Sequence, residues 1–517
     1  MIPPAHLSSA RFVWLGCIVL LVAGFLALVL RFYHPVYGFT AFFQLDESNE
    51  TIMLHELRER PVFIYRDTGG YDGLYYAQLA CRPTLRDPAL AVAMDGFSYR
   101  AHRILASWAA WALALGDPVR ALDTYALLNP LCWLVLGALL LAVFPPRSLH
   151  NVIAWAGLMF SAGVLASVRL ALTDLPALLL IVAAMVVGER GRRGGAMGWL
   201  AAAALARETS LLAALALRAG IWPRHLLRVA VVAAPLAVWL VYVRVMAGPV
   251  DAGWCNFSWP GLAFVGKWRG CLADLGRGDF SLLFWATLLT LLALTVQATW
   301  LLLRPAWDNL WWRLGIGYVG LMLCLGIAPW DGQPGAAARV LLPLHLAFNA
   351  LAPRTRGGLA LLVLGNLGFL SGVLPLLDVP HTPGEIAAAR TGETAMIARA
   401  GSGWYSVEHA GSRLWAWAGG TAHLELQLWA PASAPPPQVW LKLAGFTPRT
   451  VTVRQEGSSV WSSPVERKAR WVCLTGLEFH KGRATLTLDS DALPEPENVA
   501  PNARALAYTL SGLRLEP

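Results

Sequence analysis

The sequence predicts a polytopic α-helical membrane protein of about 11 spans, followed by a C-terminal extracytoplasmic all-β sandwich. Three observations support this fold class. Of the 517 residues, 56% are hydrophobic and only 14% are charged, whereas soluble domains carry roughly 25% charged residues. Long apolar runs recur between residues 12 and 376. Beyond about residue 400 the pattern changes to short alternating runs separated by Gly, Pro and Ser, which is typical of strands.

The first apolar run extends from Phe12 to Leu30, directly after Arg11, and is long enough to cross a bilayer. No small-residue cleavage site follows it, so we expect a retained span and not a cleaved signal peptide. Further apolar runs lie at 123–144, 151–170, 174–188, 195–206, 208–217, 226–247, 280–303, 314–329, 337–352 and 358–376. The runs 195–206 and 208–217 are too short to span alone, and we expect them to form a broken hairpin.

Arginine positions predict the orientation of these spans. With the N-terminus in the cytoplasm, the short cytoplasmic loops hold most arginines, as the positive-inside rule requires; these are Arg147, Arg190, Arg192, Arg193, Arg218, Arg224, Arg228, Arg304, Arg313, Arg354 and Arg356. The apolar segment Ile104–Gly116 is short, and if it crossed, this bias would reverse. We therefore expect it to lie in the outer interface. The loops 32–122 and 249–279 and the chain after about residue 378 are then extracytoplasmic.

Neither the basic charge nor the cysteine spacing indicates nucleic-acid binding, a zinc site or a CxxC redox site. The net charge is +9, from 41 basic and 32 acidic residues. Most arginines flank apolar runs, which indicates membrane orientation and argues against nucleic-acid binding. The seven cysteines show neither zinc spacing nor a CxxC pair. Cys255 and Cys271 share the second outer loop, where an oxidising compartment would allow a disulfide, although the sequence leaves the free thiols equally open.

The chain is divided into three parts by composition. Residues 1–378 form the predicted transmembrane domain, 379–400 a Pro/Gly/Ala linker, and 401–517 the β-sandwich. Seven tryptophans lie in the last part; we expect them in the core, with stacking on sugar rings as the functional alternative. Strand-like alternation is found at 421–429, 438–443, 450–454, 470–474, 484–488 and 507–515.

Two carboxylates in the first outer loop are candidate catalytic residues. Asp72 lies in the segment GGYDGLYYAQLA, residues 69–80, between a glycine turn and a run of tyrosines. Asp-Gly also favours turns regardless of function. Asp46, in FFQLDESNE, is the second candidate, and its alternative is a solvated loop. Two acids in one loop suit a base and a metal or substrate ligand.

Isolated charges near apolar runs are candidates for binding an anionic substrate. Arg100 and Arg103 precede the interfacial segment, where arginines bind phosphate or lipid headgroups; plain snorkelling is the alternative. Arg207 and Glu208 interrupt an apolar stretch, and charges at membrane depth usually face a cavity. They either pair structurally or bind a phosphate through Arg207.

Two further candidates lie at outer helix turns. Asp174 either caps the helix that follows, with Pro176 in its first turn, or belongs to a polar site. Asp331 and Arg339 flank Gly332-Gln333-Pro334-Gly335 as a later outer pair. Arg339 begins an apolar run, from which it either reaches a phosphate headgroup or anchors the interface.

Together these residues resemble the GT-C superfamily of integral-membrane glycosyltransferases over about residues 10–376. The local motifs look like bacterial members related to polyprenyl-phosphate-sugar-dependent mannosyltransferases. The C-terminal β region is similar to accessory domains that some members carry. The motifs are Gly70-Tyr71-Asp72-Gly73, Tyr76, Tyr99-Arg100, Arg103, Thr173-Asp174 and Arg207-Glu208-Thr209.

The resemblance implies an inverting transfer of a hexosyl, mannosyl or pentosyl group from a polyprenyl-phosphate sugar in the outer leaflet. The acceptor is a glycan, a lipid or a protein. Asp72 is then the base, with Asp46 as runner-up, and arginines stabilise the phosphate leaving group. The implied substrate contacts are Tyr71, Tyr76, Arg100, Arg103, Asp174, Arg207, Glu208, Asp331 and Arg339.

The implied location is a bacterial inner membrane, with the site and the β domain on the periplasmic side of the cell envelope. No DxD pair accompanies Asp46, so no metal ligand is assigned, and a divalent metal stays an open alternative. Two other function classes remain. A transporter or flippase for a lipid-linked sugar would show internal repeats and helices broken at midplane. A non-catalytic glycan-binding assembly protein would need no reactive carboxylate.

Overall fold

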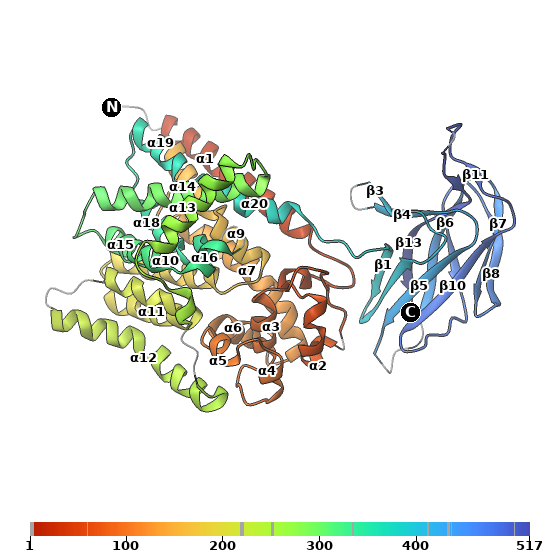
Figure 1. Cartoon of the computed structure of the whole chain (residues 1–517), viewed down its shortest axis with the longest axis horizontal. Coiled ribbons are helices and arrows are strands. Elements are labelled where there is room, and N and C mark those ends of the chain that lie inside the picture. Colours follow the sequence, from red (N-terminus) through yellow and green to blue (C-terminus); the bar gives the residue numbers. More distant parts are fainter. Residues whose placement is uncertain are drawn as a thin grey trace. The chain divides into compact units, whose positions relative to one another are not determined.

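The computed structural model describes residues 5–58, 60–217, 222–249, 253–332, 336–410, 413–431, 435, 437–500 and 502–516. These residues form two compact units, one helical and one built of strands (Figure 1). The helical unit comprises Met1–Phe32, Phe39–Arg58 and Ile64–Val379, and the β unit comprises Tyr33–Gly38, Glu59–Phe63 and Pro380–Pro517. Both the helical membrane-type unit and the C-terminal all-β unit agree with the predicted fold class.

Four helices of the described residues are long and apolar enough to cross a membrane. They are α1 (Ala5–Leu30), α7 (Pro118–Leu140), α12 (Trp222–Ala247) and α14 (Leu282–Leu303). Two helix pairs pass the same test but are bent, namely α8 (Leu149–Met159) with α9 (Ala162–Arg169) by 41° and α19 (Arg356–Leu364) with α20 (Phe369–Leu377) by 48°. The structure therefore supports four to six spans, and the total of about 11 stays a prediction.

The other predicted apolar runs correspond to shorter helices. The predicted hairpin is α11 (Arg193–Ala206) followed by the 3-10 helix η3 (Glu208–Ala216), and the break falls at Arg207, whose backbone is extended. Because Arg207 is extended, its side chain does not follow the face of either helix. It can therefore reach a residue of another element. The remaining helices here are α10 (Asp174–Glu189), η4 (Trp254–Asn256), α13 (Leu262–Gly276), α15 (Leu310–Cys324), α16 (Ile327–Asp331), α17 (Ala336–Val340) and α18 (Leu342–Leu351).

The loop between α1 and α7 folds into short helices. In the predicted interfacial segment, the helix α6 (Leu105–Leu113) packs one side against α3 and α7 and leaves Trp111, Leu113 and Leu115 exposed. One buried and one apolar exposed face are typical of a helix at a membrane surface. The other short helices are η1 (Thr40–Phe43), η2 (Glu47–Ile52), α2 (His55–Arg58), α3 (Gly73–Cys81), α4 (Ala89–Val92) and α5 (Phe97–Ala101).

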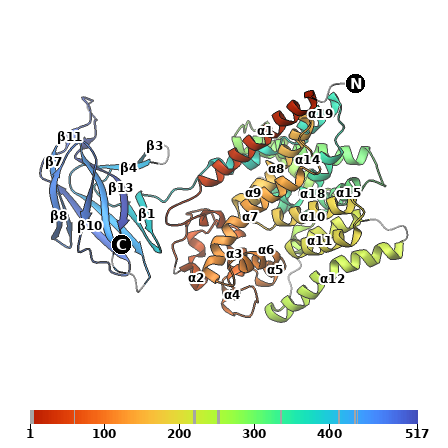
Figure 2. The same cartoon turned by 180° about the vertical axis from the view of Figure 1, so that it is seen from behind.

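The β unit is a sandwich of antiparallel sheets around an apolar core (Figure 2). The sheets have the orders β1-β2-β5-β10-β7-β8 and β3-β4-β13-β6-β9, with β11-β12 as a small third sheet. Six strands coincide with the predicted runs: β5 (Ala422–Trp429), β6 (Gln438–Gly445), β7 (Arg449–Gln455), β9 (Arg470–Leu474), β10 (Arg483–Ser490) and β13 (Tyr508–Glu516). The others are β1 (Glu385–Thr391), β2 (Thr394–Ala400), β3 (Glu408–Ala410), β4 (Arg413–Ala418), β8 (Ser458–Val465), β11 (Glu495–Pro496) and β12 (Ala505–Leu506).

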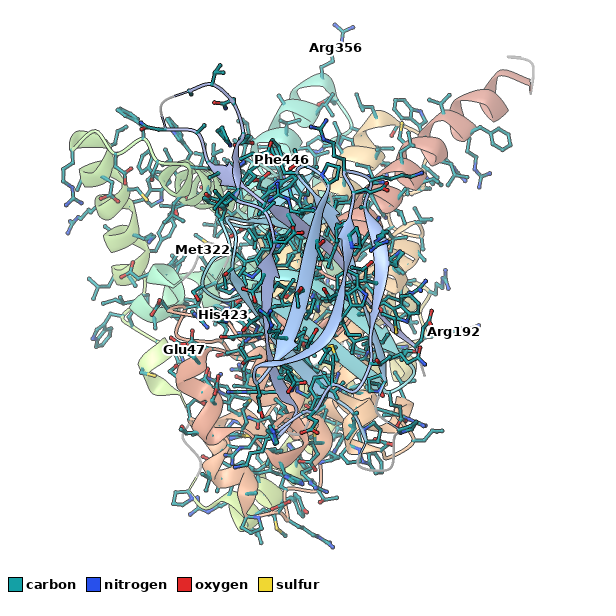
Figure 3. All side chains as sticks on the ribbon, turned by 90° about the vertical axis from the view of Figure 1, so that its right-hand side faces the viewer. Glu47, Arg192, Met322, Arg356, His423 and Phe446 are labelled. Carbon is teal, nitrogen blue, oxygen red and sulfur yellow. The ribbon has the colours of Figure 1, made fainter. Side chains whose placement is uncertain are left out.

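Polar and aromatic side chains cover the sandwich outside its core (Figure 3). His423 of β5 faces Thr487 of β10, with the imidazole Nδ1 3.3 Å from the Thr487 hydroxyl. Phe446, which follows β6, meets the ring of Trp417 edge to face at 5.8 Å between centroids. Trp404 and Trp461 pack against the apolar core, but none of the seven tryptophans of this part is fully buried and Trp471 is 37% exposed, so the expected core placement holds only in part.

The predicted linker 379–400 is largely sheet. Strands β1 (Glu385–Thr391) and β2 (Thr394–Ala400) form an antiparallel hairpin in it, and β2 pairs with β5. Alanines dominate both strands, which makes the segment look like a linker, but Ile386 and Met396 are buried in the sandwich core. A segment directly after α1, Tyr33–Gly38, also belongs to this unit, and its His34 Nε2 lies 2.7 Å from Glu385 Oε1.

Candidate active site

Asp72 is held at the start of α3 by glycines that no other residue replaces without strain. Gly70 has a φ of +71°, and a Cβ there would lie 2.2 Å from Asn49 Oδ1. A Cβ on Gly73 would lie 2.2 Å from the Leu170 carbonyl oxygen, at the end of α9. Real Cβ atoms do not approach so closely, so this turn exists only because its backbone is bare. The glycines next to Asp72 therefore fix the carboxylate against η2 and α9.

The Asp72 carboxylate is paired with Arg100 and remains 28% exposed. Arg100 Nη1 lies 2.8 Å from Asp72 Oδ2. The same guanidinium donates from Nε to Asp95 Oδ1 at 3.0 Å and from Nη2 to Asp95 Oδ2 at 2.8 Å. A bidentate bond fixes the plane of an arginine, so Asp95 orients Arg100 toward Asp72. No local pattern points to Asp95, which is one more Asp-Gly in a polar loop.

Arg103 is buried and connects three of the predicted residues. Its Nη1 donates to the Tyr76 hydroxyl at 3.0 Å and its Nη2 to the Tyr99 hydroxyl at 2.9 Å. It also forms a forked pair with Glu208, at 2.9 Å from Nε to Oε2 and 2.6 Å from Nη2 to Oε1. The first outer loop is thereby joined to the start of η3. Of the two alternatives for Glu208, the structure shows a structural ion pair, but its partner is Arg103 and not Arg207.

Asp174 is almost fully buried and is ion-paired with two arginines. Arg207 Nη1 is ion-paired with its Oδ1, and Arg339 Nη1 lies 3.7 Å from its Oδ2. Arg339 Nη2 also donates to the Tyr71 hydroxyl at 2.7 Å, next in sequence to Asp72. The N-cap residue of α10 is Thr173, so Asp174 is the first helical residue and not the cap. These bonds bring together every predicted binding residue except Asp331.

The ion-paired side chains of this site, which we call the charged cluster, have an uneven distribution of charge. Four carboxylates face four arginines, so with all groups ionised the sum is zero; they are Asp72, Asp95, Asp174, Glu208, Arg100, Arg103, Arg207 and Arg339. Arg100 serves two carboxylates, which leaves an excess of one negative charge at the Asp72 end. Asp174 serves two arginines, which leaves an excess of one positive charge at its end. Because unlike charges attract, the Asp174 end favours an anion.

The Arg207 guanidinium has capacity for a further ligand. Its Nε is buried and has no acceptor among the residues that the structure describes. A buried donor without a partner costs free energy, and an anion bound at the Asp174 end would remove that cost. Arg207 pairs with Asp174, and its role as a phosphate contact stays a prediction.

Asp46 lies outside the charged cluster and is a capping residue. It is the N-cap of η2, and its Oδ1 accepts from the Ser48 amide at 3.1 Å and hydroxyl at 2.7 Å. Its Oδ2 accepts from the Thr68 amide at 2.8 Å and hydroxyl at 2.9 Å. Burial raises the pKa of Asp46, but these four hydrogen bonds outweigh it and hold the pKa below its usual range. A carboxylate so occupied is a poor base, which corrects its place as second catalytic candidate.

Asp331 is placed differently from expectation, and Cys255 and Cys271 follow one of the two alternatives left open for them. Asp331 does not pair with Arg339; its Oδ1 lies 3.3 Å from Lys267 Nζ, and its side chain is 62% exposed. Cys255 and Cys271 are both free thiols, the first exposed and the second buried in α13. Within the described ranges, no group of three or more His, Cys, Asp or Glu side chains is arranged to hold a metal.

Comparisons with known proteins give little further. No protein-family model matches the chain, and no curated protein matches it in sequence. Among solved structures, it is similar to the arabinosyltransferase EmbB from Mycobacterium smegmatis, with 11% identity over 86% of this chain and a TM-score of 0.25. The chain spans 62% of the length of EmbB. A likeness this distant assigns neither a fold nor an activity.

Proposed function

We propose that this protein is a GT-C-type membrane glycosyltransferase, which transfers a sugar from a polyprenyl-phosphate donor to an acceptor hydroxyl at the extracytoplasmic face. One observation carries the proposal. A partly exposed carboxylate, Asp72, directly follows Tyr71, whose hydroxyl accepts from Arg339 of the arginine pair around Asp174, where positive charge is in excess. A transfer from a phosphate-linked sugar needs both a base for the acceptor and cations for the leaving group.

In the proposed reaction, Asp72 accepts the proton of the acceptor hydroxyl as its oxygen attacks the anomeric carbon. The bond between that carbon and the phosphate oxygen breaks on the opposite face, so the configuration inverts and polyprenyl phosphate leaves. Arg207 and Arg339 lie where the added negative charge of the phosphate would be stabilised. The proton passes from Asp72 to water after product release. Arg100 keeps Asp72 oriented before the attack.

The finer features of the proposal rest on the sequence. The apolar runs support about 11 spans, the arginine bias supports an extracytoplasmic site, and the motif resemblance supports a bacterial inner membrane with that site on its periplasmic side. The motif resemblance supports a hexosyl, mannosyl or pentosyl donor and a glycan, lipid or protein acceptor. In the charged cluster, Tyr71 and Tyr76 are proposed to position the substrate, because their hydroxyls accept from Arg339 and Arg103 and still carry a proton to donate.

The test is a transfer assay with purified protein in lipid nanodiscs, offered labelled polyprenyl-phosphate sugars and envelope acceptors. We expect Asp72→Asn to abolish product formation and to leave folding intact, because the amide cannot take a proton at neutral pH. Asp67→Asn is the matched control, since Asp67 is exposed in the same loop, with a φ of +55° that asparagine tolerates. Full activity of Asp72→Asn would contradict the assignment, and turnover of none of the offered donors by the unmodified protein would contradict the proposed function.

A further inference from the structure

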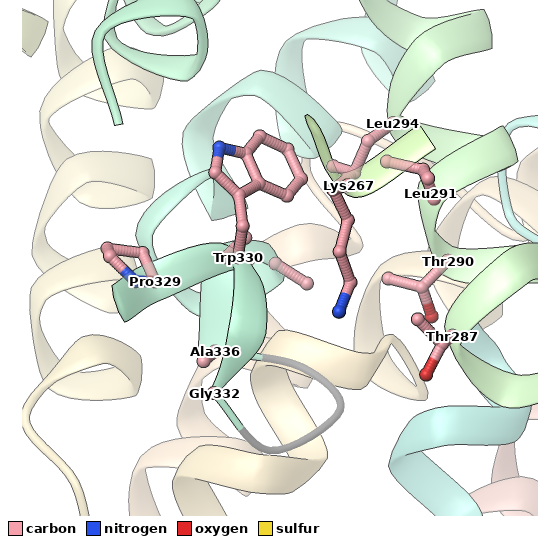
Figure 4. Close-up of a pocket in the computed structure, with 11 residues that line it drawn as sticks. Lys267, Thr287, Thr290, Leu291, Leu294, Pro329, Trp330, Gly332 and Ala336 are labelled. Atoms are coloured by element: carbon pink, nitrogen blue, oxygen red, sulfur yellow. The ribbon is translucent and has the colours of Figure 1, made fainter. Parts of the chain in front are cut away.

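A pocket separate from the charged cluster lies between α13, α14, α16 and the start of α17, and its empty volume is about 380 Å³ when the open solvent at its mouth is included (Figure 4). None of the ion-paired residues of the charged cluster lines it. Its polar side is formed by Lys267, Thr287 and Thr290, and its apolar side includes Leu291, Leu294 and Trp330. One wall carries an ammonium and the other is hydrocarbon, so the pocket suits an amphiphile.

Lys267 has hydrogen-bonding capacity to spare in this pocket. Its side chain is 21% exposed, and Nζ makes one described hydrogen bond, to Asp331 at 3.3 Å. An ammonium has three donors, so two lack an acceptor among the described residues. Asp331 is largely exposed and therefore a weak partner. In Figure 4 the ammonium points to the side of the pocket where the hydroxyls of Thr287 and Thr290 lie.

The helix that carries Lys267, α13, has this lysine on its inward face and apolar side chains on its outward face. Ala263 and Cys271, four residues before and after Lys267, are buried, so the lysine lies at the centre of the inward face. The outward face carries exposed apolar side chains, and Gly266 and Gly270 are open there; the exposed side chains are Leu262, Val265, Leu272 and Leu275. Arg269 is exposed on the same outward face, so this face combines apolar side chains with a cation, as helices at a membrane surface do.

This outward face continues into a membrane-spanning candidate. After α13 the chain passes through exposed Phe280 to Leu282 and Leu283, which are exposed on the first turn of α14. The helix α14 is one of the four that are long and apolar enough to cross a membrane. A surface continuous with the lipid-facing side of a span is itself covered by lipid. The pocket is therefore adjacent to a source of lipid.

We propose that this pocket binds the phosphate of a membrane lipid, with Lys267 on the phosphate and the lipid tail along the apolar faces of α13 and α14. The phosphate supplies the acceptors that the ammonium lacks, and Leu291, Leu294 and Trp330 cover the first carbons of the tail. This site is distinct from the proposed sugar-transfer site and needs none of its steps. It holds the second outer loop at the bilayer surface.

Photolabelling tests the pocket in the full-length protein in nanodiscs. The probe is phosphatidic acid with a photoreactive tail, and a diacylglycerol with the same tail lacks the phosphate. We expect the phosphatidic acid to label peptides from α13 and α14, and Lys267→Gln to reduce that labelling about tenfold, the loss expected for a charge-assisted hydrogen bond. Lys267→Arg keeps the charge and most of the labelling.

Two control variants distinguish binding at Lys267 from a general attraction of the lipid to basic side chains. Arg269→Gln removes a charge from the exposed face of the same helix and should leave labelling unchanged, as should Asp72→Asn, which inactivates only the proposed transfer. Equal labelling by the diacylglycerol, or an equal loss in Arg269→Gln, would overturn the proposal. Displacement of the probe by inorganic phosphate at equal concentration would also overturn it, because the ligand would then be free phosphate and not a lipid.

Discussion

Arg339 and Tyr71 are 268 positions apart in the sequence, yet Arg339 Nη2 donates a 2.7 Å hydrogen bond to the Tyr71 hydroxyl. The guanidinium also lies over the Tyr71 ring, 5.4 Å from its centroid. Tyr71 directly precedes Asp72, so this contact links the cation-rich end of the charged cluster to the turn that carries the proposed base. We therefore expect a substitution at one end of the charged cluster to affect the other end.

Tyr71→Phe tests that link. The change removes only the hydroxyl, so the free energy of unfolding should fall by about 0.5–1.5 kcal/mol. We expect the transfer rate to fall about tenfold or more, because Arg339 loses the bond that orients it. Tyr242→Phe is the control, since it loses a hydrogen bond to the Thr84 carbonyl away from the charged cluster. Equal transfer rates in the two variants would show that the link has no role in turnover.

Asp174→Asn should be strongly destabilising. It leaves two guanidinium groups, of Arg207 and Arg339, without their buried carboxylate, and breaking a buried pair costs about 3–5 kcal/mol. Asp331→Asn breaks the exposed pair with Lys267 and should cost less than about 1 kcal/mol. Thermal unfolding in detergent measures both. Similar shifts in Tm would mean that Asp174 is not the buried centre of the arginine pair.

Asp46 should contribute stability that depends on pH. Its pKa is lower in the folded protein than in the unfolded chain, so its contribution is fully present above the unfolded value of about 4. The contribution is lost as the pH falls through the folded pKa. The difference in Tm between the unmodified protein and Asp46→Asn should therefore be constant from about pH 5 to 7 and shrink below about pH 4. At temperatures where it is folded, Asp46→Asn should retain transfer; loss of turnover in the folded variant would restore Asp46 as a candidate base.

Gly73→Ala should disturb the position of Asp72. The new methyl group would meet the Leu170 carbonyl oxygen at 2.2 Å, so α3 must shift, at a cost of about 1–3 kcal/mol. Transfer should fall with it. Gly198→Ala, in α11, adds a methyl group with no atom within 4 Å and should be neutral or stabilising by up to about 1 kcal/mol. Equal effects of the two alanines on Tm and on transfer would contradict a steric role for Gly73.

The charged residues of the site were predictable because charges among apolar residues are costly and therefore stand out. Their partners were not. Arg207 meets Asp174 because the helix breaks at Arg207, a backbone detail that no local pattern shows. Asp95 has the same local sequence as an ordinary turn, so only its bidentate bond to Arg100 distinguishes it.

The strands likewise divide into those that the sequence predicts and those that it does not. Alternation of large apolar residues locates β5 and β13, whereas β1 and β2 resemble a linker in sequence because their alanines give little alternation. Both are strands because they add to an existing sheet, where small residues fit against the core. Closeness in sequence suggests Arg339 as the partner of Asp331, but the fold gives it Lys267, which is 64 positions away.

The β unit is not a module that can be cut from the end of the chain. His34 and Val36 bond with Glu385 and Arg390, which lie 351 and 354 positions later. During synthesis, this short segment emerges well before its partners, which follow 351 and 354 residues later. A domain swap between homologues, or expression of the β unit alone, must therefore carry residues 33–38 along, for instance as a linked peptide. Selection would then act jointly on two stretches that are far apart in the gene.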